Sequence, residues 1–190
     1  MTSLKKNFIY NVVYQMLLII LPLITAPYIA RTLGAEGVGI YSYTYSVAQY
    51  FLLFAMLGIS NHGNRSIAAV REDDCKLSRT FWSIYSIQAF MYVLAIIAYL
   101  IYLFAFNVDN KTIVAIQFIY VVSGALDISW YFFGTEQFKI TVTRNMIIKI
   151  ATVILMFIFV HNPGDLAKYT VIMAGGTFLS QAYLWTYIFR

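Results

Sequence analysis

Long uninterrupted apolar stretches constrain this chain more than any other feature. Runs of about 18 or more apolar residues can cross a bilayer as helices, and the sequence contains six, separated by short segments with turn-forming residues. The apolar residues run continuously and do not alternate, which favours helices over barrel strands. The chain is 61% hydrophobic and 11% charged, whereas soluble domains carry about 25% charged residues. We therefore predict an all-α integral membrane protein with six transmembrane helices, over about residues 7–30, 38–60, 80–106, 112–133, 144–161 and 167–189.

The distribution of Lys and Arg sets the expected orientation. With the N-terminus inside the cell, ten of the 13 Lys and Arg residues fall in cytoplasmic segments, and three, Arg31, Lys111 and Lys168, fall in outer ones. Cytoplasmic loops of membrane proteins are enriched in these residues. We expect a multi-pass protein with both termini of this chain in the cytoplasm.

Polar residues within the spans recur at helical steps of three and four. Polar groups are costly in hydrocarbon, so they are expected to face protein or a water-filled cavity. The stripes predict a bundle with a hydrated centre; alternatively, the same side chains hydrogen-bond one helix to the next. The stripes are Asn7, Asn11 and Gln15; Ser42, Ser46 and Gln49; Tyr120, Ser123, Asp127 and Trp130; and Asn145, Lys149 and Thr152.

Asp127 is a carboxylate inside the fourth span, and Lys149 is a cation inside the fifth. Counted from the inner ends of these spans, the two residues lie roughly 10 Å and 9 Å deep. Helices joined by a short loop are usually adjacent, and an unpaired charge in an apolar site is costly or becomes neutral. We predict an ion pair between Asp127 and Lys149. It would either place a positive group at the cavity floor or act as a static bridge.

Three further residues in the spans are candidates for function. Trp130 would anchor the membrane interface or offer its flat face to a sugar ring. Pro22 and Pro27 each remove a backbone donor and crowd the preceding turn, so we expect a bend in the first span. Such a bend serves either as a hinge or as a static kink.

Two blocks of sequence resemble one membrane protein family. PYIARTLGAEGVGIYSYTYSVAQYF with LGISNHGNRSIA is similar to the start of the Wzx-type oligosaccharide flippases. DISWYFFGTEQFKITVTRNMIIKI resembles their Asp-x-x-Trp-x-Phe-x-Gly-x-Glu segment, which leads into a helix that carries a lysine. The resemblance runs from Leu4 to about Thr186. These flippases belong to a superfamily with lipid II flippases and MATE exporters.

This resemblance implies two pseudo-symmetric six-helix bundles around a central cavity. Residues 1–190 would form the N-terminal lobe, and the C-terminal lobe would be missing. The implied role is to move undecaprenyl-pyrophosphate-linked oligosaccharide across the bacterial cytoplasmic (inner) membrane by alternating access, for capsule, O-antigen or exopolysaccharide. The expected partners are this lipid-linked oligosaccharide, membrane lipids, other polysaccharide-assembly proteins and the C-terminal lobe. We expect no cofactor, no metal and no nucleic acid.

The pyrophosphate of such a cargo requires cations. Arg is suited to phosphate because its planar fork can bind two oxygens. The candidates for cargo or gating contacts are Arg31, at the outer end of the first span, and Arg144 and Lys149, at the inner end of the fifth. Arg31 could instead be neutralised by Glu36 or cap its helix.

Three other functions compete with a flippase. A MATE-like antiporter of small cations would require acids along its cavity, and here basic groups outnumber the single intramembrane acid. A membrane enzyme of polysaccharide assembly would require catalytic groups in a large external loop, whereas the outer loops are short. A scaffold for other polysaccharide enzymes stays open. We therefore expect a transporter and no enzyme.

Overall fold

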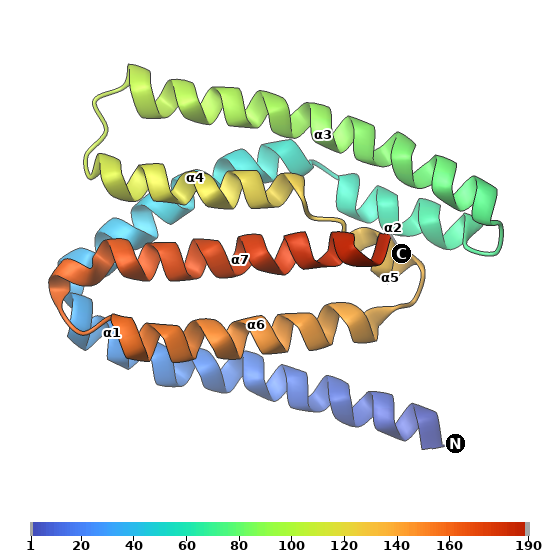
Figure 1. The fold of residues 1–190 in the computed structure, drawn as a ribbon, viewed down its shortest axis with the longest axis horizontal. Helices are drawn as coiled ribbons and strands as arrows, with labels where there is room; N and C mark the ends of the chain where they lie inside the picture. The colour runs from blue at the N-terminus through green and yellow to red at the C-terminus, as the bar shows by residue number, and fades with distance from the viewer. Residues whose placement is uncertain (1, 189–190) are drawn as a thin grey trace.

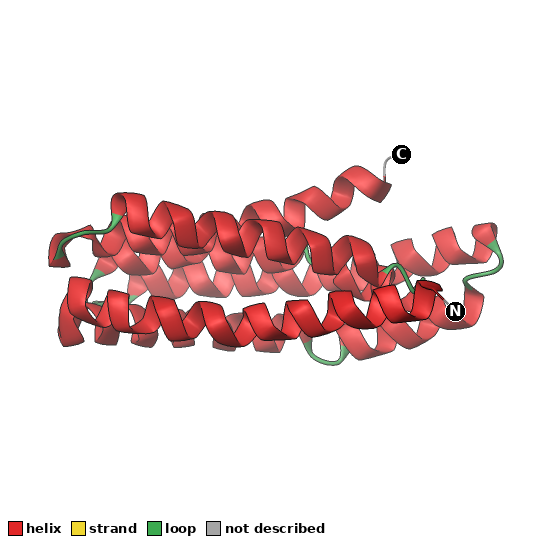
Figure 2. Ribbon diagram, turned by 90° about the horizontal axis from the view of Figure 1, so that it is seen from below, coloured by secondary structure: helices red, strands yellow, loops and turns green. Residues whose placement is uncertain are grey.

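The computed structural model describes the backbone of residues 2–188, and the side chains of these residues apart from 2–15, 17, 18 and 138. Helices make up nearly all of this part of the chain, and it contains no strand (Figures 1 and 2). The elements are α1 (Thr2–Met56), α2 (Ile59–Val70), α3 (Asp74–Ala105), α4 (Lys111–Ala125), α5 (Ser129–Gly134), α6 (Phe138–Phe159), the 3-10 turn η1 (Pro163–Asp165) and α7 (Leu166–Ile188).

The longest helix, α1, bends sharply at Gly34, so its two halves correspond to the first two predicted spans (Figure 1). Gly34 has φ 71° and ψ 174°, a backbone conformation outside the helical region. Residues with a Cβ essentially never adopt this combination. Pro22 and Pro27 lie upstream, within helical chain. The described bend is therefore at a glycine, and the role of the prolines as hinges stays a prediction.

The chain is an all-α membrane protein. Three segments of the described chain are long and apolar enough to cross a bilayer: Asp74–Ala105, Lys111–Gly134 and Lys139–Phe159. The other predicted spans also lie in helical chain, so the count of six is confirmed in part. The start of α1 and the end of α7 lie at the same end of the bundle, as an even number of passes requires (Figure 1).

Small residues and apolar clusters hold the helices together. One cluster joins α1, α3 and α4 around Tyr92 and Tyr99, and another joins α2, α3, α5 and α7 around Phe81 and Trp130. A Cβ on Gly124 would overlap Tyr92, which shows how closely α3 and α4 approach. Close approach at small residues is a typical way for membrane helices to associate.

Candidate functional site

The fourth predicted span is broken at Asp127. Helix α4 ends at Ala125, and α5 begins at Ser129. The Asp127 side chain is half-buried, and its Oδ1 accepts a hydrogen bond of 2.9 Å from the Ser129 backbone N–H. A carboxylate just before a helix satisfies an N–H group that has no partner within the helix. The acid in the apolar run therefore marks the point where the helix stops and starts again.

Side chains from α3 and α7 complete the hydrogen bonding of the interrupted backbone. Gln88 of α3 is fully buried; its Nε2 donates to the Asp127 carbonyl oxygen at 2.9 Å and lies 3.4 Å from two carbonyl oxygens at the end of α4. Trp185 Nε1 of α7 donates to the Leu126 carbonyl oxygen at 3.0 Å. Broken helices in membranes need such partners, because hydrocarbon offers none.

Trp130 is part of this same structure. Its Nε1 donates to Gln88 Oε1 at 2.9 Å, its ring stacks on Phe81, and only 1% of the residue is exposed. Gly63 of α2 approaches the indole so closely that a Cβ there would overlap it. Trp130 is therefore a core residue here, and its ring presents no open face to a sugar.

Lys149 lies deeper than the sequence predicts. Helix α6 begins at Phe138, six residues before the predicted start of the fifth span at residue 144. Residues 140–143, which we placed between two spans, are therefore helical. Within the membrane-compatible segment Lys139–Phe159, Lys149 is ten residues from either end, or about 15 Å along the helix. Its side chain is half-buried. Lys149 is therefore a cation near the middle of a span.

Asp127 and Lys149 do not form the predicted ion pair. Neither residue takes part in the ion pairs Arg71–Glu136, Lys76–Asp73 and Lys168–Asp165. The depths also differ, because Asp127 lies in the interruption near the end of its span while Lys149 lies at the middle of the next. The Asp127 side chain is held at the interruption, where its Oδ1 accepts from the first N–H of α5.

Arg144 is buried between α6 and α7, with 5% of the residue exposed. Its Nη1 donates to the Ser180 carbonyl oxygen at 2.9 Å and to Gln181 Oε1 at 3.2 Å, and its Nη2 donates to Asn145 Oδ1 at 2.8 Å. Together with Lys139, Arg144 also lines a cleft of about 390 Å³ between the two helices. The guanidinium thus ties α6 to α7 and contributes a fixed cation to the wall of this cleft.

The other candidates lie apart from this cleft. Arg31 is exposed on α1, three residues before Gly34, and the described ion pairs do not join it to Glu36. Gln49 is half-buried on the second half of α1. These two residues stay predictions as cargo contacts.

The polar stripes make hydrogen bonds where the structure describes them. Ser46 Oγ donates to a carbonyl oxygen of its own helix at 2.8 Å, and the hydroxyls of Tyr41 and Tyr120 lie 3.2 Å apart between α1 and α4. These contacts are of the kind that stabilise or link helices. The side chains of Asn7, Asn11 and Gln15 lie outside the described residues. A common hydrated interior therefore stays a prediction.

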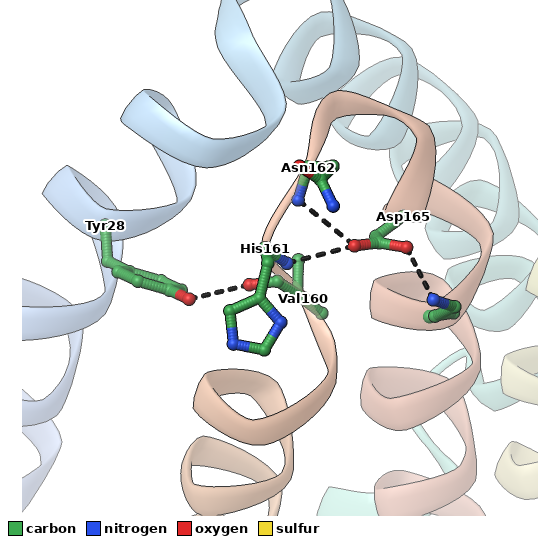
Figure 3. A network of polar contacts seen from close by, with 6 residues as sticks. Tyr28, Val160, His161, Asn162 and Asp165 are labelled. Carbon is green, nitrogen blue, oxygen red and sulfur yellow. Dashed lines mark hydrogen bonds and ion pairs between the residues drawn. The ribbon is translucent and has the colours of Figure 1, made fainter.

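A polar network that the sequence analysis missed joins α1 to the turn between α6 and α7 (Figure 3). Tyr28 donates to the Val160 carbonyl oxygen at 2.6 Å, and Asp165 accepts from the backbone N–H groups of residues 161 and 162 at 3.0 and 3.1 Å. Lys168 Nζ lies 2.7 Å from the other oxygen of Asp165. The hydrogen bond from Lys168 and those from the two backbone N–H groups lower the pKa of Asp165 to about 2.

Gln88 is another residue of this site that the sequence analysis missed, and its role is to support the break in the fourth span. A sequence signal existed, because Gln88 is the single carboxamide in the apolar run of residues 80–106. A polar group in such a run requires a partner in the protein, but the run itself does not indicate which backbone groups are exposed by a break in another helix.

Comparison with known proteins assigns the chain to a family. The family model described as "Polysaccharide biosynthesis protein" matches residues 4–190. The "Putative O-antigen transporter" of Escherichia coli (strain K12) is 29% identical over 171 residues, which cover 87% of this chain and 40% of that protein. The chain thus spans about 40% of the length of this curated relative. No solved structure gives a significant match. The chain belongs to the polysaccharide biosynthesis protein family.

Proposed function

We propose that this chain is the N-terminal lobe of a flippase that moves undecaprenyl-pyrophosphate-linked oligosaccharide across the bacterial cytoplasmic membrane. Family membership, the O-antigen transporter relative and the membrane-compatible helices support this proposal. The second lobe would come from the part of the protein that corresponds to the rest of the relative's length. The two lobes would alternate between inward-open and outward-open arrangements. The chain would carry cargo and catalyse no reaction, and both of its ends would face the cytoplasm.

The observation that carries the proposal is the position of Lys149. A charged side chain at the centre of a membrane helix costs about 3 kcal/mol on insertion scales, and such residues mark substrate or ion pathways. Asp127 does not offset this charge, because none of the ion pairs among the described side chains, which are Arg71–Glu136, Lys76–Asp73 and Lys168–Asp165, joins it to Lys149. The pyrophosphate of a passing cargo would offset it, while the lipid tail of the cargo stays in the bilayer. An exporter of small cations would require the opposite sign of charge at this depth.

Substitution of Lys149 tests the proposal. The full-length protein that carries Lys149→Gln is expressed in cells that lack the endogenous protein. It should give about tenfold or more less surface polysaccharide than wild type, since loss of one charge-assisted contact costs at least about 1.4 kcal/mol. Lys149→Arg should retain most of the display because it keeps the charge. The exposed Lys111→Gln is the matched control.

Membrane levels of each variant are measured in parallel by immunoblot. If Lys149→Gln reaches the membrane at the normal level and displays as much polysaccharide as wild type, Lys149 does not contact the cargo. If Arg31, near the end of the first span, supplies a second cargo contact, Arg31→Gln should give a smaller loss in the same assay.

A further inference from the structure

The cleft between α6 and α7 has cations at one end and apolar side chains further along α6. Its lining residues come from the first half of α6 and the last turns of α7. In Figure 1 these two helix segments run side by side near the end of the bundle where the chain begins and ends. Its volume is about 390 Å³, and its described lining contains two cations, three hydroxyls and three isoleucines but no carboxylate. The lining residues that matter here are Lys139, Thr143, Arg144, Ile147, Tyr183 and Tyr187.

Depth along α6 separates the polar and apolar parts of the cleft. Lys139 is the second residue of the helix. At 1.5 Å per residue, Arg144 lies about 8 Å and Ile147 about 12 Å further into the bundle. Ile147, at the inner part of the cleft, is 63% exposed, and Ile154 of α6 and Leu179 of α7, outside the lining, are 52% and 62% exposed apolar residues. The cleft therefore presents cations near the expected membrane surface and an apolar track toward the bilayer centre.

The cationic part is fixed before any ligand arrives. The guanidinium of Arg144 is held by hydrogen bonds to Ser180, Gln181 and Asn145. On the opposite wall the hydroxyls of Tyr183 and Tyr187 lie 3.2 Å apart. An ordered cation and paired hydroxyls lower the entropy that a bound anion would otherwise lose in ordering the site.

We propose that this cleft binds an anionic glycerophospholipid from the surrounding leaflet, with its phosphate bound by Lys139, the positive charge of Arg144 in the cleft wall adding attraction, and an acyl chain along Ile147 and Leu179. Basic pockets between membrane helices bind lipid head groups in this way. The described lining contains no carboxylate and no carboxamide, so it lacks the strong acceptors that recognition of sugar hydroxyls requires. Lys149 does not line the cleft. The bound lipid is therefore a resident ligand, separate from the cargo contact proposed above.

Lipid binding to the purified protein tests this inference. Phosphatidylglycerol or phosphatidylcholine is titrated into the detergent-solubilised protein, and bound lipid is counted by native mass spectrometry. We expect phosphatidylglycerol to bind about tenfold more tightly than phosphatidylcholine. Lys139→Ala should remove most of this preference, because a hydrogen bond to a charged group is worth about one factor of ten. Lys76→Ala, at another exposed lysine, is the matched control.

Lys139 is exposed, so its variant should fold even if the buried Arg144→Gln does not. Equal binding of the two lipids, or an unchanged preference in Lys139→Ala, would overturn the inference. So would competition by inorganic phosphate at the same concentration as the lipid, because the ligand would then be a free anion. Lys139-dependent binding of a polyprenyl pyrophosphate without binding of phosphatidylglycerol would assign the cleft to cargo and would also overturn it. If Lys149→Gln loses surface polysaccharide as expected but the lipid experiment fails, only the lipid inference is overturned and the transport proposal stands.

Discussion

Gln88 should stabilise the protein more than an equally buried glutamine elsewhere in the bundle. Its side chain makes two hydrogen bonds of 2.9 Å, one to the Asp127 carbonyl oxygen and one from Trp130 Nε1. Gln88→Leu keeps the apolar contacts but leaves both partners without their hydrogen bond. Each buried unsatisfied group costs about 1–3 kcal/mol in proteins generally, whereas hydrogen bonds between membrane helices average about 0.6 kcal/mol. For two bonds we expect a loss of about 2 kcal/mol in the free energy of unfolding.

Gln117 of α4 is the matched control. It is also fully buried, but its Nε2 makes one long contact of 3.3 Å to Thr44, and its Oε1 has no hydrogen-bond partner in the described chain. Gln117→Leu removes an unsatisfied acceptor, so it should be neutral or stabilising. The difference between the two leucine variants therefore isolates the hydrogen bonds at the break in the fourth span.

Equilibrium unfolding in mixed micelles, followed by circular dichroism over a series of SDS concentrations, measures these free energies. The double variant Gln88→Leu with Trp130→Phe should lose about 0.5–1 kcal/mol less than the two single losses together, because the two side chains share one bond. If Gln88→Leu is as stable as Gln117→Leu, Gln88 does not support the break, and the reasoning is refuted.

Three further predictions concern the bend at Gly34, the contact at Gly124 and the turn between α6 and α7. Gly34→Ala should cost about 1–3 kcal/mol, because only glycine adopts its backbone conformation easily, and the same unfolding assay would show no loss if the bend were not built on this residue. Gly124→Ala should cost about 1–3 kcal/mol through overlap with neighbouring side chains, whereas Gly175→Ala, with open space around it, should have little effect; equal losses would contradict the packing. The pKa of Asp165 is lowered to about 2, so its carboxylate stabilises the folded state above pH 4 and this contribution is lost as the pH falls from about 4 to 2. Asp165→Asn should flatten the unfolding profile in that window, and an unchanged profile would show that the carboxylate is not responsible.

The sequence predicted the fold class because the solvent sets it. Apolar runs of sufficient length must form helices in a bilayer, and the helices α3, α6 and α7 follow from this rule. The break at residues 126–128 did not follow, because it depends on Gln88 and Trp185, which are distant in the sequence. The start of α6 was also missed. Residues 140–143 lie between Lys139 and Arg144 and follow Gly134 and Glu136, so we predicted a loop there, whereas they are helical.

Site residues were harder to predict than spans. We placed Asp127 and Lys149 at equal depth on two assumptions. The first was that the fourth span is one continuous helix, which it is not at Asp127. The second was that the fifth span starts at residue 144, whereas α6 starts at Phe138, so Lys149 lies deeper. Arg144 was a candidate because of its charge, but its hydrogen bonds to α7 and its place in a cleft required the packing of two helices. Charge and periodicity thus indicate which residues are costly to bury, and three-dimensional contacts decide what satisfies them.

The central claim is that Lys149, a cation near the middle of a span, contacts the pyrophosphate of the cargo. Direct measurement of flipping tests this claim. The complete protein is reconstituted in proteoliposomes with a fluorescent polyprenyl-pyrophosphate oligosaccharide, and arrival at the far leaflet is followed by quenching with a membrane-impermeant reagent. We expect wild type and Lys149→Arg to move the cargo, and Lys149→Gln to be slower by about tenfold or more. Equal rates for wild type and Lys149→Gln would contradict the claim.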